Sequence, residues 1–359
     1  MPSSLISTFG KKCLGIDIGT ESIKIAEIAG FRKKKYLQNY SQYTLIEDSA
    51  FKIYDPNNSL PNFEKISEIL EAMFWKSGIK ERNVFFSIPD FLTLFLSIDL
   101  QPMSAQDIPA AIDFEARHQI PLPLSEVVYD WTLVQKEKIG PAVKAKAILV
   151  VVSKKTIEAF EKIGTLCNLN IVGIEPEIFA LIKSSFQEQQ PNQNEIVCLL
   201  DIGSKSTMLS LVQGNEILNS YSLDFGGSFL VNQLSEILQI TPREAQELLM
   251  KKGFSLDKKE AVEILKILSY KFSKEVLRII SEFNNRNSER CQKIIATGGG
   301  ILIPGFKEYL EEITNFNFEV ANPFKKIIAP NLLKNYLKEI SPLFGVAVGL
   351  SLTGLEYID

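Results

Sequence analysis

Two stretches of this 359-residue chain share one pattern of apolar and polar positions. At Cys13–Ile28 an apolar strand ends at Asp17, a turn of glycine and hydroxyl residues follows, and alternating apolar residues form a second strand. The same order returns at Cys198–Val212, where the carboxylate is Asp201. A hairpin repeated about half a chain apart predicts two similar domains that face each other across a cleft.

The remaining periodicity predicts further elements. Helical spacing of apolar residues and their stop signals predict helices at 60–78, 241–252, 262–283 and 343–355. A segment from about 90 to 170 has elements enough to bury a small core of its own. These are a strand at 92–100, a helix at 105–118, strands at 127–135 and 144–152, and a helix at 156–169. The polar stretch 187–195 predicts an exposed linker between the two halves.

The hairpin tips carry the candidate chemistry. Backbone N–H groups in such a glycine turn can hold a phosphate, and Asp17 and Asp201 can hold Mg²⁺ through water. A third stretch, Lys293–Phe306, runs a strand into three consecutive glycines, where a flat ring or a phosphate can approach the backbone closely. We therefore expect the two tips to clamp one nucleotide.

Composition excludes several functional classes. The net charge of −4 argues against a general nucleic-acid binder, because phosphate contacts need clustered Lys and Arg. His118 is the only histidine, which excludes His-centred metal sites and Ser-His nucleophile chemistry. The four cysteines have no CxxC spacing, so we expect reduced structural thiols. Because no apolar run approaches the roughly 18 residues of a membrane span, we expect a cytoplasmic protein.

With these three motifs in this order, the sequence resembles the actin-like ATPase superfamily, which includes actin, the heat-shock chaperone ATPases, sugar kinases and the division protein FtsA. Asp17–Ser22 resembles its first phosphate loop, Asp201–Thr207 its second, and Gly298–Gly300 its adenosine loop. The resemblance implies an α/β fold of duplicated, ribonuclease H-like domains around a nucleotide cleft that takes ATP and Mg²⁺. We expect domain I at 1–185 and domain II at 186–359, with the C-terminal helix packing back on domain I.

Within the superfamily, the chain resembles the PilM family of the type IV pilus assembly platform over nearly its whole length. Four stretches carry this closer resemblance: 118–131, 225–227, 320–324 and 342–350. It implies an FtsA/PilM-type inserted subdomain at about 90–170, whose groove against the first subdomain takes up the cytoplasmic N-terminal peptide of a PilN-like membrane protein. The prolines of 119–124 either shape this groove or simply end a helix. The protein would lie at the inner membrane through this partner, with self-association left open.

The resemblance also implies the residues of the site. The nucleotide-binding residues would be Asp17, Gly19, Thr20, Glu21, Ser22, Asp201, Gly203, Ser204, Lys205, Ser206, Gly226, Gly227, Gly298, Gly299 and Gly300. Asp17 and Asp201 would also hold the metal. In the chaperone ATPases a Glu-Pro pair helps to position the attacking water, which makes Glu175 the first catalytic candidate and Glu177 the second. Either carboxylate could instead serve a helix N-terminus, where the helix dipole favours negative charge.

Several positions depart from the family pattern. Glu21 stands where a small hydroxyl residue is usual, and its charge would repel ATP by roughly several kcal/mol if poorly hydrated. Lys205 is equally unusual in the second loop. The two side chains could bridge the empty cleft, could handle the nucleotide jointly, with Lys205 on phosphate and Glu21 on magnesium, or could point to solvent. On the ribose side, Gln246 and Leu249 replace the usual Glu and Lys.

These departures leave the activity open between a weak ATPase and a nucleotide-locked or nucleotide-free scaffold. The leading function is an actin-like component of a pilus, secretion or DNA-uptake platform. An FtsA-like division protein is an alternative, although the stretch Gly354–Asp359 offers no basic face for lipid. A small-molecule kinase is a second alternative, although the spare carboxylates of the inserted segment stand in no recognisable kinase motif.

Overall fold

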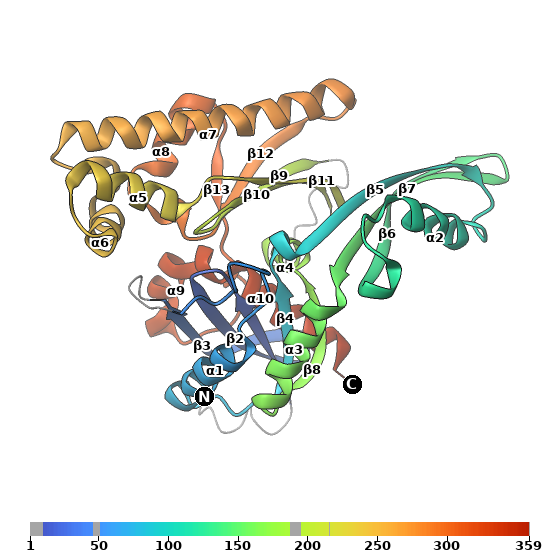
Figure 1. Ribbon diagram of the computed structural model, residues 1–359, viewed down its shortest axis with the longest axis horizontal. Helices are drawn as coiled ribbons and strands as arrows, with labels where there is room; N and C mark the ends of the chain where they lie inside the picture. The colour runs from blue at the N-terminus through green and yellow to red at the C-terminus, as the bar shows by residue number, and fades with distance from the viewer. Residues whose placement is uncertain (1–9, 46–50, 187–194, 215, 359) are drawn as a thin grey trace.

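The computed structural model describes residues 10–45, 51–186, 195–214 and 216–358. The expected linker at 187–195 lies outside the described residues, apart from Glu195. Two five-stranded sheets form the centres of the two halves, and Figure 1 shows the sheet of the second half above that of the first.

The two sheets have the same topology. The first has the order β3-β2-β1-β4-β8 and the second the order β11-β10-β9-β12-β13. In each, three antiparallel neighbours are followed by two strands added in parallel. The first sheet contains β1 (Lys11–Ile18), β2 (Ser22–Phe31), β3 (Lys34–Thr44), β4 (Asn83–Ile88) and β8 (Asn170–Pro176). The second contains β9 (Ile196–Ile202), β10 (Thr207–Gln213), β11 (Glu216–Leu223), β12 (Cys291–Thr297) and β13 (Phe318–Val320). The repeated hairpin of the sequence thus marks a repeated sheet.

Helix boundaries follow the capping signals of the sequence. Helix α1 (Phe63–Ser77) begins where the Asn62 side chain accepts from a backbone N–H, and ends at Gly78 with a φ of 67°. Helix α6 (Pro242–Lys252) begins with a capping box between Thr241 and Glu244. The end of α1 at Gly78 and the start of α6 at Thr241-Pro242 were expected; the caps at Asn62 and Glu244 were not.

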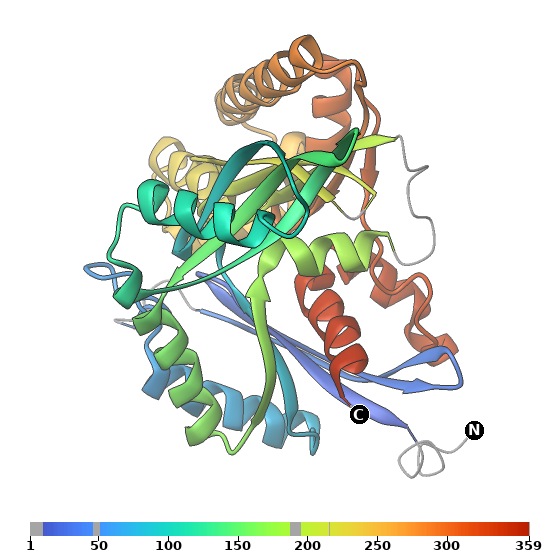
Figure 2. The same ribbon diagram turned by 90° about the vertical axis from the view of Figure 1, so that its right-hand side faces the viewer.

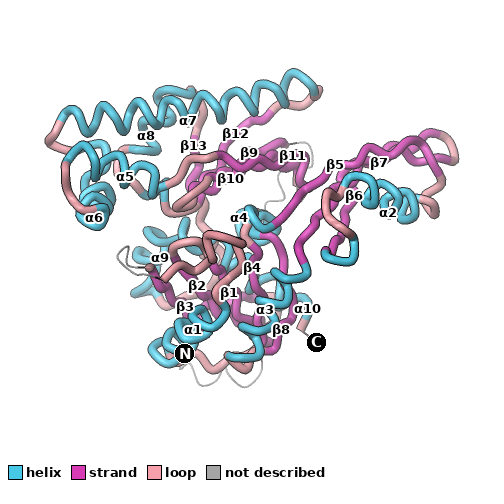
Figure 3. The backbone as a smooth tube through the Cα atoms, viewed as in Figure 1, coloured by secondary structure: helices cyan, strands magenta, loops and turns pink. Residues whose placement is uncertain are grey.

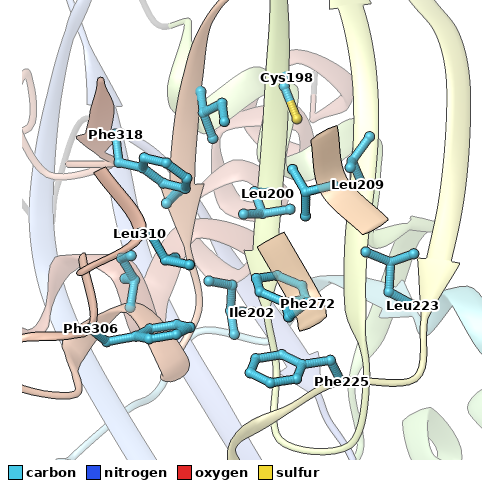
Figure 4. Packing of buried hydrophobic residues seen from close by; sticks show 14 of the residues in the cluster. Cys198, Leu200, Ile202, Leu209, Leu223, Phe225, Phe272, Phe306, Leu310 and Phe318 are labelled. Atoms are coloured by element: carbon cyan, nitrogen blue, oxygen red, sulfur yellow. The ribbon is translucent and has the colours of Figure 1, made fainter. Parts of the chain in front are cut away.

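The second half buries its largest core beneath a layer of helices (Figure 1). These are α5 (Gly227–Leu238), α6, α7 (Lys259–Arg286) and α8 (Phe306–Thr314). Phe225, just before α5, stacks on Phe272 of α7 with ring centroids 4.1 Å apart, and Phe306 of α8 lies beside both rings, 6.1 Å from Phe225 and 6.5 Å from Phe272 (Figure 4). This aromatic stack fixes the start of α5 against the sheet, which matters for the site below.

Two helices, α4 (Glu177–Ser185) and α10 (Gly345–Tyr357), lie between the two sheets (Figure 2). One buried cluster takes in their side chains together with side chains of both sheets. Glycines allow the contact, because a Cβ on Gly15 would meet the Ala347 carbonyl oxygen at 1.9 Å and one on Gly349 would meet that of Ala180 at 1.9 Å. The C-terminal helix α10 therefore packs on the first half.

Among the described residues, one helical segment, Asn331–Tyr357, is long and apolar enough to cross a membrane by length and composition, although none was expected. It includes α9 (Lys334–Ile340) and α10. Its most apolar window is 72% buried inside the protein. We attribute its hydrophobicity to the contact with both sheets, since core helices pass the same test.

A separate three-stranded sheet, β5-β7-β6, extends from the first half (Figure 3). It consists of β5 (Thr93–Met103), β6 (Val127–Ile139) and β7 (Ala142–Ser153), and α2 (Ile108–Gln119) covers one face. Helix α3 (Lys154–Leu166) was expected in this inserted unit, but Phe160 and Ile163 pack with α1 and the first sheet. By packing, the inserted unit thus ends near residue 153, because the apolar face of α3 fits the larger core.

Candidate functional site

A cavity of about 360 Å³ opens where the two halves meet. The tips of both hairpins, the first turns of α4 and α5, one face of α6 and the glycine turn after β12 line it. Of the predicted nucleotide-binding residues, all but Gly226 line this cavity. Gly226 instead lets α5 begin close to the second tip, since a Cβ there would meet the Ser204 carbonyl oxygen at 2.2 Å.

The two hairpin tips have the same internal hydrogen bond. Gly19 donates its N–H to the Ser22 carbonyl over 2.9 Å, and Gly203 donates to the Ser206 carbonyl over 3.0 Å. The second tip also receives the first two N–H groups of α5, from Gly227 to the Gly203 carbonyl (3.0 Å) and from Ser228 to the Ser204 carbonyl (2.9 Å). Helix α5 is thereby fixed to the second tip.

The glycine turn packs directly against the second tip. Gly298 has a φ of 86°, a conformation that favours glycine, and donates its N–H to the Pro342 carbonyl over 3.0 Å. A Cβ at Gly298 would lie 2.5 Å from Asp201 Oδ1. Glycine is required here because no side chain fits between the turn and the tip.

Four carboxylates and one ammonium line the cavity near the hairpin tips: Asp17, Asp90, Glu177 and Lys24 come from the first half, and Asp201 comes from the second. Lys24 Nζ lies 3.1 Å from Asp17 Oδ2, and Ser87 Oγ donates to Asp17 Oδ1 over 3.3 Å. Burial disfavours the charged form of Lys24, but Asp17, Asp201 and Glu177 outweigh it and raise the pKa of Lys24. With one cation among four acids, the site has an excess of negative charge.

The other three acids respond to that excess. Burial, and then the charge of Asp17, raises the pKa of Asp201 to about 6 despite the opposing effect of Lys24. Burial and neighbouring carboxylates raise the pKa of Asp90 and of Glu177 well above the usual range. Asp90 Oδ1 is buried without a hydrogen-bond partner among the described residues. A divalent cation entering with a polyphosphate would relieve this repulsion.

The residues fit a metal held mainly through water and phosphate oxygens. Asp17 and Asp201 both line the cavity, as predicted for the metal ligands. Within the described ranges, no group of three or more His, Cys, Asp or Glu side chains is arranged to hold a metal ion directly. Mg²⁺ usually takes one or two carboxylates plus substrate phosphates and waters, so the two aspartates suffice.

Glu21 and Lys205 do not bridge the cleft to each other, which is one of the three alternatives given above. The Glu21 carboxylate accepts a hydrogen bond from Ser228 Oγ over 2.7 Å and a second from Ser204 Oγ. Lys205 lies exposed at the rim of the cavity and is within 4 Å of no carboxylate in the described part of the chain. Glu21 does bridge the cleft, but to two hydroxyl groups, because α5 carries a second serine to that point.

Glu175 does not line the cavity, whereas Glu177 does. Strand β8 ends at Pro176, and its Glu175 carboxylate accepts from Thr353 Oγ1 of α10 over 3.3 Å. Burial raises the pKa of Glu175 to about 7, partly offset by Thr353 and Lys183. The structure thus places the second catalytic candidate in the site and the first outside it.

Among the cavity residues that the sequence reasoning missed, three bear on its charge and hydrogen bonding: Lys24, Asp90 and Ser228. Lys24 had a signal, since it is the charged position between the buried Ile23 and Ile25 of β2. Asp90 and Ser228 had none, because each depends on which element the chain brings alongside. Gln246 and Leu249 line the cavity as expected from their helix position.

Comparisons with known proteins agree with this geometry. The profile of a family described as "Type IV pilus assembly protein PilM" matches residues 15–355. The cell division protein FtsA of Buchnera aphidicola subsp. Baizongia pistaciae (strain Bp) is 22% identical over 237 residues, 57% of this chain, and the chain matches only 54% of the length of that protein.

Solved structures share the fold. A chain of the PilM-PilN type IV pilus biogenesis complex superposes with a TM-score of 0.82 at 18% identity, over 96% of this chain and 98% of that chain. MreB 5 of Spiroplasma citri bound to AMPPNP superposes with a TM-score of 0.55 at 12% identity, over 95% of both chains. The fold is therefore the duplicated actin-like fold that the sequence predicts.

Proposed function

Because the chain belongs to the family of the type IV pilus assembly protein PilM, we propose that it is an actin-like, ATP-binding component of a type IV pilus, secretion or DNA-uptake platform. One observation carries the nucleotide part of this proposal. Both hairpin tips and the glycine turn, found separately in the sequence, line a single cavity between the halves. The match to FtsA supports a division protein less well, since it spans only 54% of that protein.

The cavity offers distinct surroundings for each part of ATP. The glycine turn Gly298–Gly300 and the buried Leu249 form a wall without polar side chains that is suited to the adenine ring, with Gln246 as a polar group for the ribose. The hairpin tips are suited to the phosphates, and Lys24 is the buried cation on that side. Mg²⁺, held by Asp17 and Asp201 through water, would supply charge neutralisation.

Weak hydrolysis is part of the proposal, with Glu177 as the residue that orients water. Its side chain lines the cavity on the side of Asp17 and Asp201. Its raised pKa favours the protonated form until a cation enters, so the carboxylate would become a hydrogen-bond acceptor for water when Mg²⁺ lowers that pKa.

The partner in this proposal is the cytoplasmic N-terminal peptide of a PilN-like membrane protein, which would keep the protein at the cytoplasmic face of the inner membrane. The structural neighbour described as a PilM-PilN complex supports it. The inserted unit also exposes large apolar side chains near its junction with the first half: Phe91, Leu94, Leu122 and Val128. Fluorescence anisotropy with the labelled peptide of the PilN-like protein from the same genome tests this part directly.

Calorimetric titration with Mg·ATP tests the nucleotide part, using Asp201→Asn as the variant. The variant should fold, because burial disfavours the charged form of Asp201 and Asn is a neutral side chain of similar size. Loss of the metal ligand should weaken Mg·ATP binding about tenfold or more, equivalent to about 1.4 kcal/mol or more. Asp257→Asn is the matched control, because Asp257 is 88% exposed and pairs with Lys252 away from the cavity. Failure of the wild-type protein to bind Mg·ATP would contradict the proposal.

A further inference from the structure

The Glu21 carboxylate lies at the second tip, in the place where we expect a phosphate group of a bound nucleotide. It comes from the first hairpin tip, yet both its oxygens accept hydrogen bonds from the second half, from Ser204 Oγ and from Ser228 Oγ at 2.7 Å. The two hydroxyl oxygens are themselves 2.5 Å apart. All three side chains line the cavity.

The two serines form a built site for an anion. Backbone hydrogen bonds from Gly227 and Ser228 to the second tip hold both hydroxyl groups in place. These bonds also occupy the first two N–H groups of α5, so α5 offers its Ser228 hydroxyl, and not these N–H groups, as a donor to the cavity. Carboxylate and phosphate oxygens are interchangeable as acceptors for such donors. Either one can occupy this site.

We propose that Glu21 is a latch: when the cleft holds no nucleotide, its carboxylate occupies the Ser204–Ser228 hydroxyl site and ties the two halves together, and a phosphate group of ATP must displace it to bind. The inference rests on the proposed nucleotide function. Two anions cannot share the two donors, and the exposed Lys205 does not pair with Glu21 to neutralise it. Glu21 therefore lowers the nucleotide affinity by holding the cleft in a competing closed state.

A magnesium-binding role for Glu21 predicts the opposite effect of mutation. Glu21→Gln keeps an oxygen acceptor for one serine but removes the charge. If Glu21 is a latch, this variant binds Mg·ATP more tightly, whereas a metal ligand changed to Gln would bind it more weakly. Glu21→Ser removes the latch altogether and supplies the hydroxyl that the related loops carry. The sign of the change therefore separates the two roles.

The experiment combines calorimetry with hydrogen–deuterium exchange of the nucleotide-free protein. A latch closed in about 90% of the molecules lowers the apparent affinity about tenfold, so we expect Glu21→Ser to bind Mg·ATP about tenfold more tightly. Without nucleotide, residues 19–22 and 227–230 should exchange faster in Glu21→Ser than in the wild-type protein. Ser228→Ala removes a partner of Glu21 in the second half, so exchange in the same two segments should also become faster in this variant. Glu68→Gln, on the exposed face of α1, is the control for charge removal.

The outcomes separate the latch from the function on which it rests. Faster exchange together with tighter Mg·ATP binding supports the latch. Unchanged exchange in both Glu21→Ser and Ser228→Ala, with normal Mg·ATP binding, overturns the latch and leaves the nucleotide function standing. Weaker binding by Glu21→Gln overturns the latch in favour of a metal ligand. Absence of Mg·ATP binding in every variant overturns both.

Discussion

At the scale of single residues, Glu175 and Glu177 are only two positions apart in the chain but have different surroundings. They flank Pro176, where β8 ends and α4 begins. Glu177 turns into the cavity among the acids, while Glu175 lies against Thr353 of α10. Their pKa values are both raised by burial, but only Glu177 also feels the other carboxylates of the site.

The position of Glu175 gives a pH-dependent prediction. Its pKa of about 7 in the folded protein is above its ordinary value of 4.5, so the folded state is penalised once the carboxylate is charged. Stability therefore falls as the pH rises from about 4.5 to about 7, by at most about 3 kcal/mol, and the penalty is complete above pH 7. Glu175→Gln keeps an acceptor for Thr353 and should raise the free energy of unfolding at pH 8 by up to about 2 kcal/mol.

Urea denaturation at pH 4.5 and pH 8 measures this effect. At pH 4.5 the wild-type carboxyl group is largely neutral in the folded state, so the variant and wild type should be about equally stable. An equal gain at both pH values would show that the charge of Glu175 is not its cause.

At the scale of elements, the packing of α10 decides how the halves are joined. Its small residues allow the helix backbone to touch β1 and α4 directly. The Ser351 hydroxyl, buried in this contact, donates to the Cys13 carbonyl over 2.8 Å. Close backbone approach leaves no room for added atoms, and overpacking such a contact is destabilising.

We predict that Gly349→Ala lowers the free energy of unfolding by about 3 kcal/mol, because its Cβ would meet the Ala180 carbonyl oxygen at 1.9 Å and backbone would have to move. Gly30→Ala in β2 is the matched control. A Cβ there would meet its nearest atoms, in the Lys35 and Leu355 side chains, at 3.5 and 3.6 Å, an ordinary contact. The control should change stability by less than about 0.5 kcal/mol in the same denaturation experiment. Equal effects of the two changes would contradict this account of α10.

At the scale of the whole molecule, the inserted unit connects with both halves. One face of its sheet packs on α2 to form its own core. On the opposite face, Val134 and Ile148 join the same buried cluster as Ile217 of β11 in the second half. Strand β6 lies beside β11. The unit that carries the proposed peptide site thus also contacts the second half of the proposed nucleotide cleft.

Two substitutions by alanine, one on each face of the inserted sheet, should distinguish the roles of these two faces. Val134→Ala removes contact with the second half, so hydrogen exchange in β11 should become faster, with a loss of about 1 kcal/mol in local stability. Ile112→Ala, in the core under α2, should loosen α2 by about 3 kcal/mol and leave exchange in β11 unchanged. If both variants affect β11 alike, the inserted unit does not contact the second half through this face.

The sequence by itself determined the duplicated architecture. Each copy of the apolar strand, Asp-Ile-Gly turn and alternating strand specifies a hairpin through local patterning alone. Local patterning also indicated Asp17, Asp201 and the glycines of 298–300, all of which line the cavity. The stop at Gly78 and the Thr241-Pro242 start are equally local: α6 begins next to Thr241 as predicted, whereas α1 begins at Phe63, three residues after the predicted start.

Only the tertiary structure decided which residues of distant elements lie opposite one another. The partners of Glu21 are 183 and 207 residues away along the chain, and no local pattern distinguishes Ser228 from Lys205 as its neighbour. Likewise α3 joins the larger core rather than the inserted unit, and Glu177 rather than Glu175 enters the cavity. Hydrophobic periodicity fixes which face of an element is buried, but the contacts between elements depend on the packing of the whole chain, because side-chain fit and long-range pairing are settled together.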